Sequence, residues 1–153
     1  SFVRPMQVGA ALSQNAKGKR QNFLHFAESF GLALGLAFQI QDDLLDLTAT
    51  SSNVGKSVMN DVREGQKTVF TQYASRDAKN RLLLNRMKGK KMTVRDRKRL
   101  KQMFEESGAI EYGIEMMETL FDEAERVVRT SGLSKKRQVP FLEMVEYIRA
   151  RSN

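Results

Sequence analysis

Three carboxylates lie inside one short apolar segment, where their spacing favours metal chemistry. Residues 38–46 read FQIQDDLLD and contain Asp42, Asp43 and Asp46. Residues three and four apart share a helix face, so Asp42 and Asp46 align and Asp43 lies beside Asp46. Charges are costly to bury without a partner, so the cluster predicts a bound cation. Because Mg²⁺ takes few carboxylates and completes its shell with water and phosphate oxygens, we expect a phosphate-handling metal site.

Composition narrows the possible partners of this segment. The 153 residues predict one domain with a sizeable core. The chain has no cysteine and a single histidine, His25, which excludes disulfides, thiolate metal sites and His-rich metal sites. The net charge of +8, from 26 Lys and Arg against 18 Asp and Glu, favours anionic partners.

The sequence predicts a cytoplasmic chain that does not span a membrane. The longest nearly uncharged run, residues 29–41, is shorter than the roughly 18–20 residues that cross a bilayer. The first residues lack the pattern of a signal peptide. Basic runs at 17–20, 88–91 and 95–101 have no interleaved aromatic residues, so they predict solvated surfaces rather than a nucleic-acid interface.

The elements that must position the aspartates are helices. No run alternates with period two, whereas apolar residues recur at helical spacing in about six segments: 2–12, 22–47, 69–87, 94–107, 110–130 and 141–151. Thr93 with Asp96 predicts a capping box, and Pro140 predicts the start of the last helix. Residues 55–68 predict an irregular polar segment. We therefore expect a single all-α domain over residues 1–153.

The aspartate segment resembles a known family. Together with GKSVMNDVREGQKT at 55–68 and YIRAR at 147–151, it is similar to the C-terminal half of a trans-isoprenyl diphosphate synthase of the polyprenyl synthetase family, which includes the farnesyl and geranylgeranyl diphosphate synthases. The resemblance implies the C-terminal portion of an isoprenoid-synthase-type helical bundle. The family's second aspartate-rich motif, GxxFQxxDDxxD, is matched position by position by Gly35, Phe38, Gln39, Asp42, Asp43 and Asp46.

The next family element, approximately GKxxGxDxxxGKxT, is matched only in part. Met59 replaces a usual Gly, and Gln66 stands at the place of the second Lys, with Lys67 beside it. One residue along a helix is a turn of about 100°, so the resemblance leaves open whether Lys67 replaces that lysine. The matching positions are Gly55, Lys56, Asp61, Gly65 and Thr68.

The resemblance implies a prenyltransferase. The family condenses an allylic diphosphate with isopentenyl diphosphate, and by the resemblance this chain takes part in making a short- or medium-chain prenyl diphosphate. The implied cofactor is Mg²⁺, with Mn²⁺ as the alternative. Asp42 would be the main metal ligand, with Asp43 and Asp46 completing the site directly or through water.

Further residues take roles from the resemblance, each with a plainer alternative. Lys56 would contact the diphosphate, or is a solvated loop lysine. Phe38 and Gln39 would line the substrate cavity. Arg151 matches a C-terminal arginine that resembles an isopentenyl diphosphate contact in some members, or is an ordinary helix-end arginine. Asp61, in the loop motif, would bind metal through water or cap the helix that follows.

The family's first aspartate-rich motif is absent upstream of residue 35. Judged by the family, roughly the N-terminal half is missing, so we expect this chain alone to be incomplete as an enzyme. Its partners would then be a complementing N-terminal half or further copies in a homo-oligomer such as a dimer. The alternative is a non-catalytic partner or regulatory subunit of a full-length prenyl diphosphate synthase. A third possibility is two copies that face their aspartate helices across a shared cavity.

Overall fold

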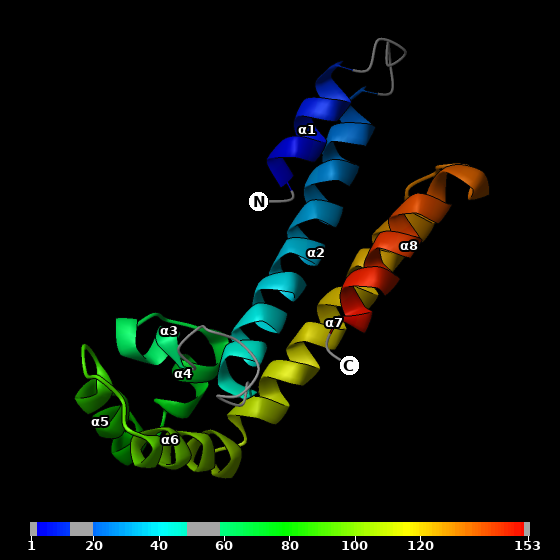
Figure 1. Cartoon of the computed structure of the whole chain (residues 1–153). Helices are drawn as coiled ribbons and strands as arrows, with labels where there is room; N and C mark the ends of the chain where they lie inside the picture. Colours follow the sequence, from blue (N-terminus) through cyan, green and yellow to red (C-terminus); the bar gives the residue numbers. More distant parts are fainter. Residues whose placement is uncertain (1–2, 13–19, 49–58, 152–153) are drawn as a thin grey trace. The chain divides into compact units, whose positions relative to one another are not determined.

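Every regular element in the described part of the chain is an α-helix (Figure 1). The computed structural model describes residues 3–12, 20–48 and 59–151. The all-α prediction is confirmed, and these residues form eight helices rather than about six. Their bounds are α1 Val3–Leu12, α2 Arg20–Thr48, α3 Asn60–Glu64, α4 Val69–Ala74, α5 Ala78–Met87, α6 Val94–Glu106, α7 Ala109–Thr130 and α8 Lys135–Ala150.

The predicted helix over residues 69–87 is wrong, because the segment forms two helices. Helix α4 ends at Ala74, and Asp77 starts α5 as its N-cap residue. The Asp77 carboxylate accepts hydrogen bonds from the backbone N–H groups of Lys79 at 2.8 Å and Asn80 at 3.0 Å. These bonds satisfy N–H groups that a new helix start leaves without intrahelical partners, so a local cap overrides the apolar pattern.

Two further boundaries differ from prediction. The segment over 55–68, predicted to be irregular, contains the short helix α3. Only the part of this segment from Met59 onward belongs to the described residues. Pro140 does not open α8 but lies inside it. The helix begins earlier because the carbonyl of Ser134 accepts hydrogen bonds from the N–H groups of Arg137 at 2.8 Å and Gln138 at 3.1 Å. Pro140 supplies no N–H to the hydrogen-bond ladder, and a proline ring inside a helix crowds the carbonyl four residues before it, yet the helix continues through this position.

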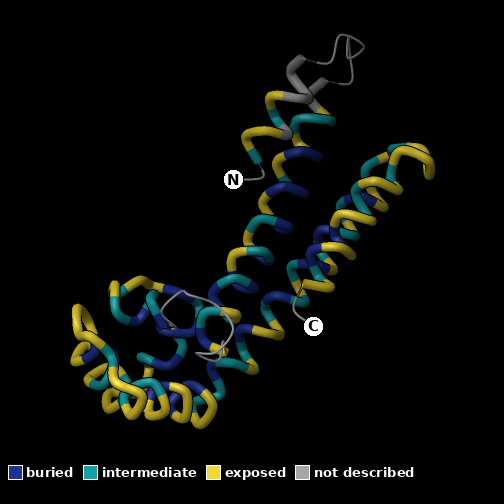
Figure 2. Tube along the Cα trace, in the orientation of Figure 1, coloured by how far each residue is buried: buried dark blue, intermediate teal, exposed yellow. Residues whose placement is uncertain are grey.

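The chain divides into two compact units, and helices α2 and α7 contribute residues to both. Unit 1 comprises Ser1–Gln39 and Met117–Asn153, and unit 2 comprises Ile40–Met116. Along both units the buried residues follow one side of each long helix, as Figure 2 shows. The prediction of a single domain stays a prediction.

In unit 1, α8 packs against both α2 and α7. The ring of Phe141 on α8 meets Phe26 and Phe30 of α2 edge to face, with centroids 5.1 and 5.4 Å apart. Phe30 is fully buried, as is Phe121 of α7. Aromatic pairs at this distance and angle stabilise a core beyond the apolar area that they bury. The C-terminal helix is therefore attached to α2 through the aromatic contacts of Phe141.

In unit 2, short helices pack around Phe70. Helix α4 contacts α5 and α6, and α3 contacts α5. Phe70, Leu100 and Phe104 are fully buried. The Phe70 ring lies directly on Gly113 of α7, where a Cβ atom would overlap the ring. Glycine at this position is required by the close approach of an aromatic side chain rather than by backbone conformation.

Helix α2 also has the length and composition of a membrane-spanning segment between Asn22 and Thr48. The core helix of a soluble bundle has the same features, and about half of the apolar window is buried inside the protein. Among its fully buried residues are Ala27, Phe30, Leu34 and Ala37. The sequence-based expectation that the chain does not span a membrane stays a prediction.

Candidate metal and diphosphate site

The three aspartates lie in the last turns of α2, which confirms their predicted place on a helix. Asp43 is buried, with 8% of its surface exposed, whereas Asp42 and Asp46 are half-buried. On the same helix, one and two turns before them, Phe38 is half-buried and Gln39 is exposed. Helical geometry turns Asp42 and Asp43 about 100° apart, so the two neighbours face different surroundings.

Asp46 lies against the start of α3. Its backbone carbonyl accepts a hydrogen bond from the N–H of Met59 at 3.3 Å. Burial raises the pKa of the Asp46 carboxyl and the charge of Asp61 raises it further, while hydrogen bonds from the backbone N–H groups of Asp61 and Asn60 act in the opposite direction. One oxygen, Oδ2, is buried without a hydrogen-bond partner in the part of the chain that the structure describes.

Asp61 is the carboxylate that the structure adds to the aspartate motif. Burial raises its pKa, and the charge of Glu64 raises it further. Asp61 lies in the first turn of α3, whose N-cap residue is Met59, and the N–H groups of Asn60 and Asp61 at this helix start donate to the Asp46 carboxylate. The alternative that Asp61 caps the helix is therefore wrong. Two neighbouring carboxylates with raised pKa values form a site that favours a proton or a cation.

The described residues test whether this acid pair suits a divalent ion. No group of three or more His, Cys, Asp or Glu side chains among them could hold a metal ion, so the aspartate trio does not converge on one point. Mg²⁺ needs only one or two carboxylates when phosphate oxygens and water complete its shell. A partly buried carboxylate with an unpartnered oxygen, beside a second acid, fits that requirement.

Met59 takes up the conformation that glycine usually supplies. Its φ of 65° and ψ of 37° are left-handed, and its side chain is buried with 2% exposed. Non-glycine residues occupy this region at a cost in free energy. The left-handed conformation at position 59 is therefore kept where the family motif has Gly, with a buried Met side chain in its place.

The lysine positions of the loop motif are only partly described. Lys56 lies outside the described residues. Gln66 and Lys67 are both exposed, between the C-cap Gly65 and the N-cap Thr68. The Gln66 side-chain amide donates a hydrogen bond to Glu64 Oε2 at 3.1 Å. Gln66 therefore contacts the last residue of α3, as a lysine at this position also could.

The structure brings two of the predicted substrate-binding residues together in unit 1. The guanidinium carbon of Arg151 lies 4.7 Å from the centre of the Phe38 ring. A cation over an aromatic face at this distance is attracted by the ring quadrupole. Phe38, which opens the FQxxDD sequence, and Arg151, which ends YIRAR, thus belong to one contact, although they lie far apart in the sequence.

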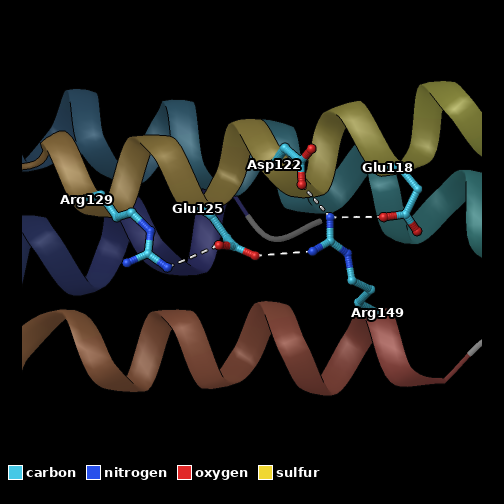
Figure 3. Close-up of polar contacts among 5 residues, drawn as sticks. All are labelled: Glu118, Asp122, Glu125, Arg129 and Arg149. Atoms are coloured by element: carbon cyan, nitrogen blue, oxygen red, sulfur yellow. Dashed lines mark hydrogen bonds and ion pairs between the residues drawn. The ribbon is translucent and has the colours of Figure 1, made fainter.

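A second arginine of the C-terminal segment, Arg149, was not identified from the sequence (Figure 3). It donates hydrogen bonds to Glu125 Oε1 at 3.2 Å and Asp122 Oδ1 at 2.6 Å, and pairs with Glu118 Oε2 at 3.0 Å. The three acids follow one face of α7 at spacings of four and three residues. That acidic stripe was the available signal, but nothing local showed which cation would meet it.

Comparisons of the sequence with known proteins find one family. The profile of the Polyprenyl synthetase family matches residues 1–107. The geranylgeranyl diphosphate synthase of Sulfolobus acidocaldarius is 41% identical over 69 residues, or 45% of this chain. The geranylfarnesyl diphosphate synthase of Aeropyrum pernix is 32% identical over 107 residues, or 70% of this chain.

Solved structures show the same fold. The decaprenyl diphosphate synthase from Rhodobacter capsulatus matches 99% of this chain with a TM-score of 0.80 at 23% identity. The geranylgeranyl pyrophosphate synthetase from Pyrococcus horikoshii Ot3 matches 96% with a TM-score of 0.78 at 26% identity. The predicted isoprenoid-synthase-type bundle is confirmed. The matches cover 20% and 33% of the two curated relatives and 46% and 44% of the two solved chains, so this chain spans less than half of each.

Proposed function

The chain belongs to the polyprenyl synthetase family, and on that basis we propose that it supplies the second aspartate-rich motif of a Mg²⁺-dependent prenyltransferase. The reaction would condense isopentenyl diphosphate with an allylic diphosphate to a short- or medium-chain prenyl diphosphate. The names of the two archaeal relatives, a geranylgeranyl and a geranylfarnesyl diphosphate synthase, support this product class. The aspartate motif at the end of α2 supports the site.

One observation carries the proposal. Asp46 holds a buried carboxylate oxygen without a hydrogen-bond partner in the described residues, next to a second acid, Asp61. The backbone N–H groups of Asn60 and Asp61 bond to this carboxylate, but the cost of burying its second oxygen is not offset, and a cation that arrives with the substrate would offset it. A divalent ion bound to a diphosphate has that character.

Different residues of the site would bind the metal ion and line the substrate cavity. Asp42 and Asp46 would hold the ion from one helix face, with Asp43 and Asp61 nearby and water between. Bound Mg²⁺, or Mn²⁺ in its place, would neutralise the charge that grows on the leaving diphosphate. Phe38 and Gln39 would shape the cavity one to two turns earlier on α2.

Two cations would bind the substrate diphosphates. Lys56 would act as a point charge on the allylic diphosphate. Arg151 would contact isopentenyl diphosphate, and its position over Phe38 supports a place near the aspartate helix. A guanidinium offers several N–H donors, so it can stack on the ring and donate to phosphate oxygens at the same time.

We further propose that the active assembly contains more than this chain, either a complementing N-terminal half or a second copy in a homo-oligomer. Leu32 and Leu36 support this idea, because they are 54% and 46% exposed and lie one turn apart on α2. A neighbouring pair of exposed leucines on a long helix is a plausible contact for another helix.

The alternative function is a non-catalytic partner or regulatory subunit of a full-length prenyl diphosphate synthase. Gln66 favours it, because an uncharged side chain stands where the family has a second lysine, and its amide contacts Glu64. Such a subunit would bind a catalytic synthase and change its rate or product without needing its own aspartates.

The test measures condensation of labelled isopentenyl diphosphate with geranyl or farnesyl diphosphate in Mg²⁺, for the chain alone and mixed with a full-length synthase. Product that disappears with Asp42→Asn but persists with Glu105→Gln, an exposed surface control, supports the prenyltransferase. Stimulation of the synthase that is equal for Asp42→Asn and the parent chain supports the regulatory subunit. Neither product nor stimulation from any mixture would contradict both.

A further inference from the structure

A basic pocket, apart from the aspartate site, lies within unit 2 where α3, α4 and α5 meet. Its volume is about 340 Å³. Neither Asp46 nor Asp61 lines it. Its polar lining includes Gln66, Lys67, Arg81, Asn85 and Lys88.

The charge of this pocket is of one sign. Among the described residues that line it, the charged ones are Lys67, Arg81 and Lys88, all basic. None of the three has an ion pair in the described part of the chain. Cations gathered around a concave surface repel one another and concentrate positive potential there. An anion in the pocket would relieve that repulsion.

Hydrogen bonds fix the backbone of the loop that carries Lys67. Thr68 and Thr71 form a capping box at the start of α4, and the Thr71 hydroxyl donates to the carbonyl of Gln66 at 3.1 Å. The side-chain amide of Gln72 donates to the carbonyl of Lys67 at 3.4 Å. The backbone that presents Lys67 is thus fixed from both sides, which lowers the entropy lost when a ligand binds.

Lys88 is placed by two glycines. The N–H of Gly89 donates to the carbonyl of Arg63 at 2.7 Å, which ties the end of α5 to α3. The Lys88 stem then lies across Gly65, where a Cβ atom would be only 2.9 Å from Lys88 Cε. Gly65 also has a φ of 72°, which favours glycine. Glycine at position 65 therefore leaves room for the Lys88 stem along the pocket wall.

The position of Arg81 is not explained by helix stability. It lies in the first turn of α5, where the helix dipole disfavours cations, and it forms no ion pair in the described residues with Asp77, the N-cap acid four residues before it. Lys88, at the other end of α5, is favoured by the dipole and would be stable there without a ligand. Arg81 is for this reason the more informative of the two cations.

We propose that this pocket binds a small phosphate anion, of the size of inorganic phosphate or pyrophosphate, without a metal ion. Three cations provide charge, and the amides of Gln66 and Asn85 provide further donors. The neighbouring acid Glu64 is engaged by Arg63 at 3.4 Å and Gln66 at 3.1 Å. The pocket volume of about 340 Å³ is near the lower limit for ligand pockets, which is about 300 Å³, and this size suits a small anion. The pocket is separate from the Asp46–Asp61 pair, so the inference does not rest on the proposed function.

The test is calorimetric titration of the whole chain with inorganic pyrophosphate in EDTA at low salt, where the aspartate site has no ion to bind the ligand. Arg81→Gln and Lys88→Gln should each weaken binding by about five- to tenfold, the loss of one charge-assisted contact. The matched control is Arg86→Gln, an exposed cation on α5 that does not line the pocket. Circular dichroism spectra and thermal unfolding confirm that each variant is folded.

Vesicles of phosphatidic acid distinguish a lipid headgroup from a free anion as the source of the phosphate. Pyrophosphate binding that Arg81→Gln weakens and Arg86→Gln leaves unchanged supports the pocket with a free anion. Binding to vesicles alone, with the same dependence on Arg81, supports the pocket with a headgroup phosphate. Absence of binding to either, or an equal loss in Arg81→Gln and Arg86→Gln, would overturn the proposal.

Discussion

The guanidinium of Arg151 lies over the ring of Phe38, 4.7 Å from its centre, and joins the end of the chain to the start of the aspartate motif. We expect the two side chains to be coupled by about 0.5–1 kcal/mol, the usual strength of such a pair near the surface. A double-mutant cycle with Phe38→Leu, Arg151→Met and both, followed by urea unfolding, measures this coupling. Losses that simply add would show that the two side chains do not interact.

The ion pairs of Arg149 should contribute more to the free energy of unfolding than the exposed ion pairs within α7. Arg149→Met leaves Glu118, Asp122 and Glu125 close together without their shared cation, and should lower the free energy of unfolding by roughly 1–2 kcal/mol, less in high salt. The control is Arg126→Met, whose partner Glu123 lies three residues away on the same exposed surface; no measurable loss is expected there. Equal losses in urea unfolding would contradict the prediction.

At position 59, glycine should be more stabilising than alanine, the reverse of the usual order in a helical protein. Both Met59→Ala and Met59→Gly lose a buried side chain and should destabilise the protein by about 2–5 kcal/mol. Because φ is 65°, the alanine variant keeps the left-handed strain and glycine releases it, so Met59→Gly should be more stable than Met59→Ala by about 1 kcal/mol. Denaturant unfolding of the two variants side by side gives the difference directly. If alanine is the more stable, the turn has rearranged.

Asp46→Asn should stabilise the metal-free chain at pH 7. Burial raises the pKa of Asp46, so ionisation of this group opposes folding, and the opposition fades as the pH falls through the folded pKa toward the unfolded pKa of 3.8. Asparagine removes the charge, and the gain over the parent chain should shrink on going from pH 7 to pH 4. Thermal unfolding at both pH values measures it.

The same variant should lose any stabilisation that Mg²⁺ with pyrophosphate gives to the parent chain, because a ligand that binds only the folded state raises its stability. Glu105→Gln is the matched control, with its charge on an exposed surface. A variant that is less stable than the parent without metal, yet responds normally to Mg²⁺, would contradict the assigned role of Asp46.

Asp96 should show the opposite pH dependence. Hydrogen bonds from the Thr93 backbone and from Lys90, at 2.9 Å each, hold the pKa of this half-buried carboxyl well below its usual range. A lowered pKa gives stability that is complete above the unfolded value near 3.8 and is lost as the pH falls toward the folded value. The difference in melting temperature between the parent chain and Asp96→Asn should therefore be constant from pH 7 to pH 5 and shrink progressively as the pH falls below 3.8. A difference that is as large at pH 2 as at pH 7 would refute the assignment.

Features set by neighbours in the sequence were predicted well. The capping box at Thr93 and Asp96 is confirmed, with the Asp96 N–H donating to Thr93 Oγ1 at 3.2 Å. The position of Asp42, Asp43 and Asp46 at the end of a long helix is confirmed for the same reason, since the apolar pattern and the loop after it are both local. The break at Asp77 was also local, but the apolar residues on both sides hid it.

Features set by partners distant in the sequence were not predicted. Arg149 meets its acids across 24 and 27 residues, and the choice of partner depends on how α8 lies on α7. The left-handed turn at Met59 has no signal in its residue type, since it is imposed by the packing of the turn. Asp61 joins Asp46 only because α3 folds back on the end of α2. The metal and substrate roles of these residues stay predictions.

Helix α2 is continuous from Arg20 to Thr48, so the number of residues between two of its side chains sets the directions in which they point. Each inserted or deleted residue between Gln39 and Asp42 would rotate every carboxylate after it by about 100° relative to Phe38 and shift it by about 1.5 Å. Libraries of random insertions and deletions should accordingly tolerate length changes after residue 130, between α7 and α8, and reject them between residues 39 and 42, even where point substitutions there still fold.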